Sequence, residues 1–412
     1  MSVVWILVIL ACIFAFYMAW NIGANDVANA MAPAVGSGIL TLRNAIIIAA
    51  IAEFLGAVLV GSSVTSTIRK GIVSPSLFEN DPTIFMLGMT SALLGAALWL
   101  HSATLIGMPV STTHSIVGAV IGFGLIAKGP SSLDYWTLSK IVMSWFVSPF
   151  FGGFLGFSLF YFIRKKILNQ ENQDKATRFF APYILFFTSV ILLQSFVFKA
   201  MKNLKLPVNF VTVLLMGCFL GIIIAFFSKK ILDKIGTEDE QNSLTNKFFI
   251  FLLILTSGYV AFAHGANDVA NSVGPFSAVL DVFMTGKVSL SKVPVPIWVL
   301  ILGGVGIVSG LALSGWKVIS TIGGKITEIT PQNGFSAQLA AATTVLFCSQ
   351  LGLPISTTHT VVGSVIGVGM ARGINALDLA VCGKIITSWV LTLPFAAGMT
   401  MLVYSILRSI VF

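Results

Sequence analysis

The chain carries the same two motifs twice, in the same order. Residues 23–30 read Gly-Ala-Asn-Asp-Val-Ala-Asn-Ala, and residues 265–272 repeat them with one change, Ser272 in place of the last alanine. A second motif, Pro-Val-Ser-Thr-Thr-His at 109–114, returns as Pro-Ile-Ser-Thr-Thr-His at 354–359. Each pair includes polar residues of the same type at the same spacing. This pattern indicates one site assembled from two halves.

The duplication extends beyond the motifs and divides the chain. The paired motifs lie 242 and 245 residues apart, and residues 108–124 match residues 353–369 at 11 of 17 positions. We therefore interpret residues 1–163 and 248–412 as homologous halves. A linker over 164–247 joins them.

The composition indicates that both halves lie in a membrane. Charged residues make up 9% of the chain, against about 25% in an ordinary soluble domain. Apolar stretches of about 20 residues, long enough to cross a bilayer, recur from end to end. Residues 3–20 form the first; no basic segment precedes it, so we interpret it as a retained helix and not a signal peptide. The sequence therefore predicts an all-α polytopic membrane protein.

Basic residues in the linker predict how the two halves are oriented. The segments 164–178 and 229–247, interpreted as polar loops, contain five and four Lys or Arg residues. They flank two predicted helices at 179–198 and 207–228. By the positive-inside rule both loops face the cytoplasm. The halves then have inverted topology, and both chain termini are expected outside.

The segment before each Ser-Thr-Thr-His motif is predicted to be short and interrupted. Residues 93–107 contain His101, Ser102 and Thr104, and residues 339–353 contain a similar polar run. Each segment ends in a Gly-x-Pro turn, and another apolar helix follows at once. This pattern predicts two re-entrant helical hairpins with tips near the bilayer midplane. Paired interrupted segments in corresponding halves are typical of a transporter's binding site.

The hairpin tips offer hydrogen-bond donors to an anion. Pro109 and Pro354 fit the start of a helix, whose first amides lack internal partners and carry partial positive charge. We expect an oxyanion to bind between the tips; the expected ligands are Ser111, Thr112, Thr113, Ser356, Thr357, Thr358, Asn25 and Asn267. The alternative is plain N-capping of two buried helices.

The Asn-Asp motifs offer oxygen ligands to cations. A carboxylate inside a membrane is costly and is usually functional, and oxygen ligands suit hard cations. Gly23 and Gly265 suggest locally unwound helix, which frees carbonyl oxygens. The expected cation ligands are Asp26, Asp268, Asn29, Asn271, Glu53 and Gln338, of which Glu53 and Gln338 have no duplicate. The alternative is that the Asp and Asn side chains only join helices by hydrogen bonds.

The motifs also predict coupling between a cation and an anion. No Arg or Lys lies within either motif, so an anion between the tips would face two uncompensated carboxylates. Sodium ions, or protons on the aspartates, would remove this repulsion. His114 and His359 are interpreted as structural, and His264, which aligns with Ile22, as lying outside the repeated machinery.

These residues resemble the inorganic phosphate transporter (PiT) family of secondary transporters. The resemblance rests on the two motif pairs, on Ala-Glu-Phe-Leu-Gly at 52–56 and on Thr-Ile-Arg-Lys-Gly at 67–71. It implies cation-coupled phosphate import, inverted repeats and about 12 membrane segments. Gln338 stands where sodium-coupled relatives carry glutamate, and a few relatives move sulfate. The resemblance therefore leaves a proton-coupled phosphate or sulfate permease as the alternative.

We expect a secondary active transporter, not an enzyme, that imports phosphate by sodium symport with alternating access. An intramembrane hydrolase is disfavoured because every candidate group is duplicated, whereas a catalytic triad needs single groups in distinct roles. Buried acids argue against a passive anion channel. We expect no cofactor, with sodium ions as co-transported ligands. The expected partners are phosphate, sodium and the lipid bilayer, without nucleic acid and with a homo-oligomer left open. The short middle segment favours the cytoplasmic (inner) membrane of a bacterium or archaeon.

Overall fold

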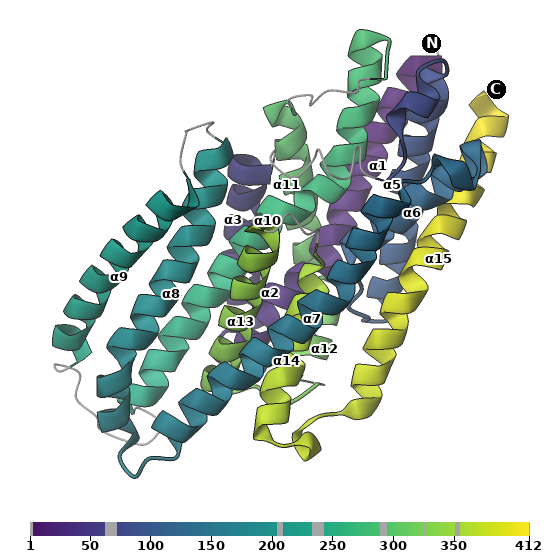
Figure 1. Cartoon of the computed structure of the whole chain (residues 1–412). Coiled ribbons are helices and arrows are strands. Elements are labelled where there is room, and N and C mark those ends of the chain that lie inside the picture. The colour runs from purple at the N-terminus through teal and green to yellow at the C-terminus, as the bar shows by residue number, and fades with distance from the viewer. Residues whose placement is uncertain are drawn as a thin grey trace.

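Long helices form nearly all of the structure (Figure 1). The computed structural model describes residues 3–61, 72–203, 209–232, 243–288, 295–324, 326–350 and 355–411. Its α-helices are α1 (Val3–Asn25), α2 (Val27–Gly36), α3 (Leu42–Val60), α5 (Pro82–Leu105), α6 (Thr112–Lys128), α7 (Tyr135–Ile163), α8 (Gln173–Asn203), α9 (Phe210–Leu232), α10 (Leu244–Thr285), α11 (Ile297–Ser314), α12 (Trp316–Gly324), α13 (Pro331–Gln350), α14 (Thr357–Arg372) and α15 (Leu379–Val411). Short 3-10 turns precede α5, α7 and α15.

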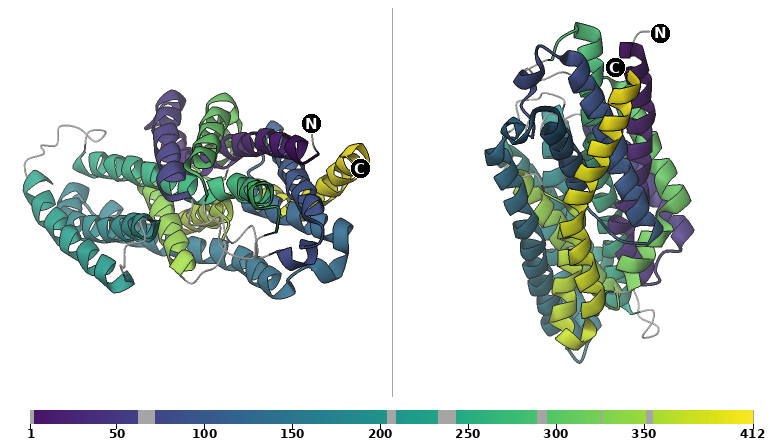
Figure 2. Two further views of the ribbon diagram at one scale, coloured as in Figure 1. Left: turned by 90° about the horizontal axis from the view of Figure 1, so that it is seen from above. Right: turned by 90° about the vertical axis from the view of Figure 1, so that its right-hand side faces the viewer.

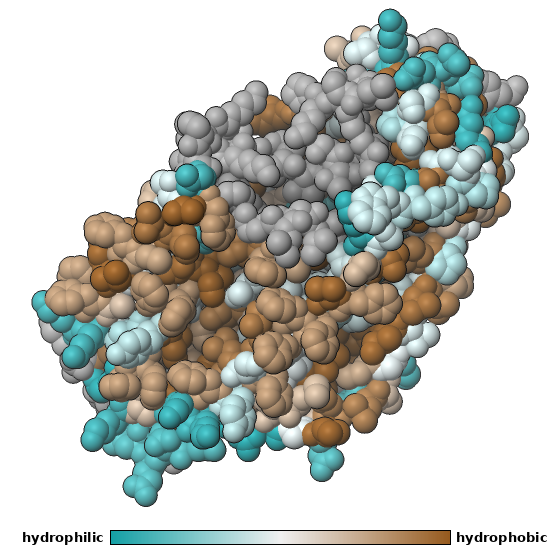
Figure 3. All heavy atoms as spheres, viewed as in Figure 1, coloured by the Kyte–Doolittle hydropathy of each residue, from teal (hydrophilic) through white to brown (hydrophobic). Residues whose placement is uncertain are grey.

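The surface and the helix lengths confirm a polytopic membrane protein. Within the described ranges, nine helical spans are long and apolar enough to cross a membrane, with α1 and α2 counted together. Hydrophobic side chains cover the middle of the face in Figure 3, and hydrophilic ones gather toward its ends. The shorter α6, α12 and α14 and the less apolar α13 complete the bundle.

The two halves are inverted repeats, as predicted. Helix α7 runs away from the end of the molecule that holds both termini, and its counterpart α15 runs back toward that end (Figure 1). The hairpin α5–α6 enters the bundle from the end with the termini, and α13–α14 enters from the opposite end. Helices α8 and α9 lie together at one side, far from the termini (Figure 2).

The halves exchange packing partners across the molecule. Helix α7 packs on α14 while α15 packs on α6, and α1 packs on α11 while α10 packs on α3. The motif glycines make two of these crossings possible. A Cβ on Gly23 would clash with the backbone of Ile307, and one on Gly265 with the backbone of Glu53. The two clashes are equivalent in the repeat and support its alignment.

The prediction of unwound helix at the Asn-Asp motifs is wrong for half two, and in half one the helix is divided only at the single residue Asp26. Helix α10 continues through Asp268 without a break, and in half one α1 and α2 meet at Asp26, whose backbone keeps helical angles. The glycines serve close packing of helices and do not open the backbone.

The interruption predicted before the first tip is also wrong, although the hairpin itself is present. Helix α5 is continuous from Pro82 to Leu105. The hydroxyls of Ser102 and Thr104 donate to carbonyls one turn earlier, at 2.9 and 2.8 Å. The helix therefore absorbs these polar residues. The predicted helix start at Pro354 lies outside the described residues.

The polar loop predicted over 164–178 is much shorter in the structure. A π-helical turn at Arg164–Leu168 extends α7, and α8 already begins at Gln173. In the second predicted loop, 229–247, α9 extends to Leu232 and α10 begins at Leu244; residues 233–242 lie outside the described ranges. Charged side chains on both sides of these connections therefore belong to helix ends.

Candidate functional site

The serine of each tip caps a helix. The hydroxyl oxygen of Ser111 accepts a hydrogen bond from the backbone N–H of His114 at 3.2 Å, and Ser356 accepts one from His359 at the same distance. Capping satisfies one of the free amides at a helix start. Each hydroxyl still has its own proton to donate, so capping does not remove the serines from the predicted anion site.

The threonines of the two tips meet the aspartates. Thr112 donates to one Asp26 carboxylate oxygen at 2.5 Å, and Thr358 from the opposite hairpin donates to the other at 2.7 Å. Asp268 accepts from Thr357 at 3.0 Å. Both aspartates are almost fully buried. The structure thus brings together residues from both motif pairs.

Two asparagines cross between the halves in an equivalent way. The side-chain amide of Asn29 donates to Thr358 of the second tip at 2.9 Å. The amide of Asn271 donates to Thr112 and Thr113 of the first tip, at 3.1 and 3.4 Å. The two contacts are equivalent in the repeat and cross between the halves in opposite directions. The approximate two-fold axis that relates the halves therefore passes through the site.

Asn25 holds the first tip in place. Its amide donates to the Thr104 hydroxyl at 2.9 Å and to the Met108 carbonyl at 3.0 Å, and its carbonyl oxygen accepts from the Val110 N–H at 3.0 Å. These bonds occupy the groups predicted to bind phosphate. In the second half, Asn267 donates to the neighbouring Asp268 at 2.7 Å.

His264 lies at the centre of the acids, although the sequence interpretation excluded it. One ring nitrogen, Nδ1, is 2.9 Å from both carboxylate oxygens of Glu53. The other, Nε2, is 2.7 Å from Asp268 and 3.7 Å from Asp26. The signal that marks it is spacing, because residues four apart on a helix share a face and His264 precedes Asp268 by one turn.

Gln338 and Asn29 leave buried oxygens without partners. The Gln338 amide donates to the Ala30 carbonyl at 2.6 Å. Among the described residues, its Oε1 and the Oδ1 of Asn29 have no hydrogen-bond partner. Unpaired buried acceptors are costly and suit a cation that binds oxygen. The predicted roles of Gln338 and Asn29 as cation ligands therefore fit this geometry.

One nitrogen and two carboxylates also lie close enough to share an ion. Single ligand atoms of Asp26, His264 and Asp268 lie within 4.8 Å of one another. In this arrangement the imidazole occupies the space between the carboxylates. A cation that bound both aspartates would therefore have to move the imidazole aside or take its place between them.

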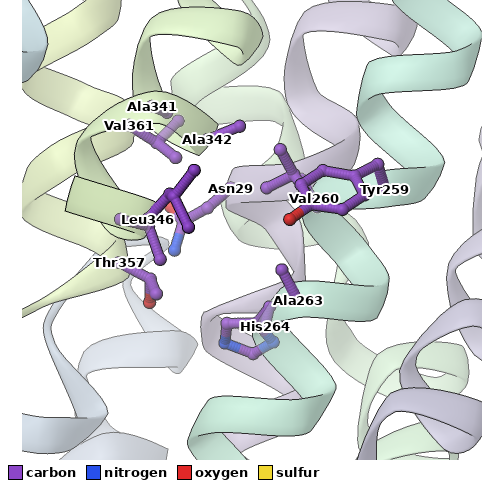
Figure 4. A pocket seen from close by; sticks show the side chains of 12 residues that line it. Asn29, Tyr259, Val260, Ala263, His264, Ala341, Ala342, Leu346, Thr357 and Val361 are labelled. Carbon is purple, nitrogen blue, oxygen red and sulfur yellow. The ribbon is translucent and has the colours of Figure 1, made fainter. Parts of the chain in front are cut away.

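A small cavity reaches the site from between α10 and α13 (Figure 4). Tyr259, Ala263 and Leu346 line it, together with His264 and Thr357 of the acid network. Its volume of ≈ 20 Å³ has room for about one water molecule. The cavity itself is therefore too small to hold a tetrahedral oxyanion.

The sequence matches known proteins along nearly its whole length. A model of the phosphate transporter family matches residues 22–400. Relatives from Pyrococcus horikoshii and Haemophilus influenzae carry the name "putative phosphate permease"; each is 42% identical to this chain, over 98% of it and over 98% and 97% of their own lengths. A solved structure described as the sodium-dependent phosphate transporter has a TM-score of 0.89 and 42% identity, covering 98% of this chain and 99% of its own. The chain therefore belongs to the phosphate transporter family.

Proposed function

We propose that this protein imports inorganic phosphate by symport with sodium ions, by alternating access around the site between the hairpin tips. The observation that carries the proposal is the pairing of tip threonines with aspartates. The hydroxyls of Thr112, Thr357 and Thr358 donate to Asp26 or Asp268. The sodium-dependent phosphate transporter of the solved structure supports the choice of ions.

This pairing supplies a physical basis for coupling. The carboxylates and the anion compete for the same donors, because the hydroxyls that would bind phosphate already donate to Asp26 and Asp268. A cation bound to the carboxylates attracts them away from the tips and offsets their charge. The hydroxyls and helix N-termini are then free to bind an anion. Phosphate without cations would face two buried negative charges.

The test is the cation dependence of phosphate binding and uptake. Asp26→Asn and Asp268→Asn each remove one of the competing charges, so phosphate binding should depend much less on sodium. Uptake into proteoliposomes with and without a sodium gradient, and isotherms in detergent, would measure the change. Asp281→Asn, on α10 but away from the tips, is the matched control. Wild-type sodium dependence in both site variants would contradict the proposal.

A proton-coupled phosphate or sulfate permease is the second candidate. It is favoured by His264, which already supplies an imidazole to three acids, and by the uncharged Gln338. Uptake driven by a pH gradient without sodium would select proton coupling. Sulfate that competes as well as phosphate would select the wider substrate range. Gln338→Glu should steepen the sodium dependence if sodium is the coupling ion, because it adds a carboxylate beside Asn29.

A further inference from the structure

Four aromatic rings form a row beside the hairpin tips, and the proposed function leaves them unused. The rings of His114 and His359 meet edge to face, with centroids 4.3 Å apart. His114 lies 3.7 Å from Trp145 of α7, and His359 lies 3.7 Å from Trp389 of α15, between ring centroids. All four residues belong to the duplicated sequence. Each half therefore contributes one His–Trp pair, and the two pairs meet through their histidines.

Each histidine is tied closely to its own tip. The backbone N–H of His114 donates to the capping Ser111, and Thr112, two residues earlier, donates to Asp26. Two residues correspond to about 200° around a helix, so ring and threonine point to nearly opposite sides of the helix start. His359 has the same relation to Ser356 and Thr357. Ring and threonine belong to the same first turn of their helix, so a shift of that turn moves both.

Ring packing, with little hydrogen bonding, holds the row together. The two histidines are 1% and 2% exposed. Among the described residues, both ring nitrogens of His114, Nε2 of His359 and the indole nitrogens of Trp145 and Trp389 have no hydrogen-bond partner. The remaining nitrogen, His359 Nδ1, is 3.5 Å from the Trp145 carbonyl. Close-packed interiors transmit changes in side-chain volume, so the size of these rings governs how near the two tips approach.

We propose that His114 and His359 are a positioning pair that sets the distance between the tips and thereby the size of oxyanion that the site accepts. This inference rests on the proposed function, in which threonines of both tips bind one anion. The ligand class is the tetrahedral oxyanion, and the competitor that reports on the spacing is arsenate, which is larger than phosphate.

The experiment measures Kd for phosphate and for arsenate on the purified protein in saturating sodium. His114→Ala and His359→Ala let the tips approach, so arsenate should lose affinity relative to phosphate by about tenfold, the discrimination typical of a small size change in a pocket. His114→Phe and His359→Phe insert larger rings, so the ratio should shift toward arsenate. His101→Ala is the control, because this histidine lies on α5 and its ring contacts Tyr17 and Trp20 of α1. It should leave the ratio unchanged.

Opposite shifts for the Ala and Phe variants would support the positioning role. Equal loss of both affinities, or no change in either, would overturn it, since a purely structural role moves stability and not the ratio. If the Ala variants do not fold, the Phe variants still decide the outcome. Failure of the wild-type protein to bind either anion would instead contradict the proposed function.

Discussion

Glu53, Asp26 and Asp268 share one imidazole in the interior of the protein. Removing one partner from a buried charge cluster typically costs about 3–5 kcal/mol, because the remaining charge is left uncompensated. We therefore expect His264→Gln to lower the thermal unfolding midpoint in sodium-free buffer. Sodium should then stabilise the variant more than it stabilises the wild type, since a bound cation supplies the missing charge. Unfolding in detergent with sodium or choline chloride measures this, and His101→Gln is the control. Equal stabilisation by sodium in both proteins would contradict the expectation.

The tip threonines lead to a second prediction about single residues. Hydrogen bonds to charged groups contribute about 1.5–3 kcal/mol, so Thr112→Val and Thr357→Val should each raise the phosphate Kd roughly ten- to a hundredfold. Because the tips are equivalent in the repeat, both substitutions should weaken binding, and the double variant should nearly abolish it. Thr344→Val is a matched control, since this buried hydroxyl donates to a carbonyl of its own helix. Unchanged affinity in both single variants would move the anion site elsewhere.

Much of the candidate site could be predicted from the sequence, because duplicated motifs mark residues that act in pairs. The aspartates and threonines that the motifs singled out do come together in space. Duplication also hid His264, because this residue aligns with the apolar Ile22 and so does not repeat. The network around Asn25 was equally hidden, since its bonds to the tip depend on how α1 packs against α5. Such tertiary contacts leave no periodic signal in a single sequence.

At the scale of helices, the repeat includes the N-terminal caps of the counterparts α7 and α15. Asp134 accepts from the N–H groups of Trp136 and Thr137 at the start of α7, and Asp378 accepts from those of Ala380 and Val381 at the start of α15. Loss of a capping carboxylate typically costs about 1 kcal/mol. We expect Asp134→Ala and Asp378→Ala to lower the free energy of unfolding by this amount, measured by denaturant titration in detergent.

The matched control and the pH response follow from the same bonds. Asp81 precedes α5 without a side-chain capping bond, so Asp81→Ala should have a smaller effect. Hydrogen bonds from Thr137 hold the pKa of Asp134 below its ordinary value. Its contribution is therefore complete above that ordinary value and is lost as pH falls through the lowered, folded-state pKa. Equal destabilisation by all three substitutions would contradict a capping role.

Helix type was easier to predict than helix length. The apolar stretches at 3–20, 179–198 and 207–228 correctly indicated α1, α8 and α9. The breaks inferred from Ser102 and Thr104 were wrong because hydroxyls bond to carbonyls of the preceding turn and leave the helix intact. The charged residues after residue 163 misled the prediction in a similar way. They were interpreted as the start of a polar loop, but the helix continues through Leu168.

At the scale of the whole molecule, the inverted repeat could be predicted from the sequence. The repeated motifs indicated the duplication, and the basic residues of the linker indicated that the halves are inverted. The exchanged packing of α7 on α14 and α15 on α6 could not be predicted from it. Hydropathy identifies segments that enter a membrane, but in one sequence nothing specifies which segment becomes the neighbour of another. That exchange interlocks the halves and places both tips at one site.

The orientation of the molecule is the last expectation, and it is tested by labelling. The structure places the turn after α7 at the opposite end from both termini (Figure 1), and the basic linker predicts that this end faces the cytoplasm. In a protein whose four cysteines are replaced, a cysteine at the exposed Gln170 should react with an impermeant maleimide only from the cytoplasmic side. A cysteine at the exposed Glu79, just before α5, should react only from outside. Labelling of both positions from one side would contradict the fold, because each half of an inverted repeat must cross the membrane an odd number of times. Reversed labelling would keep the fold and overturn only its orientation, placing the termini in the cytoplasm.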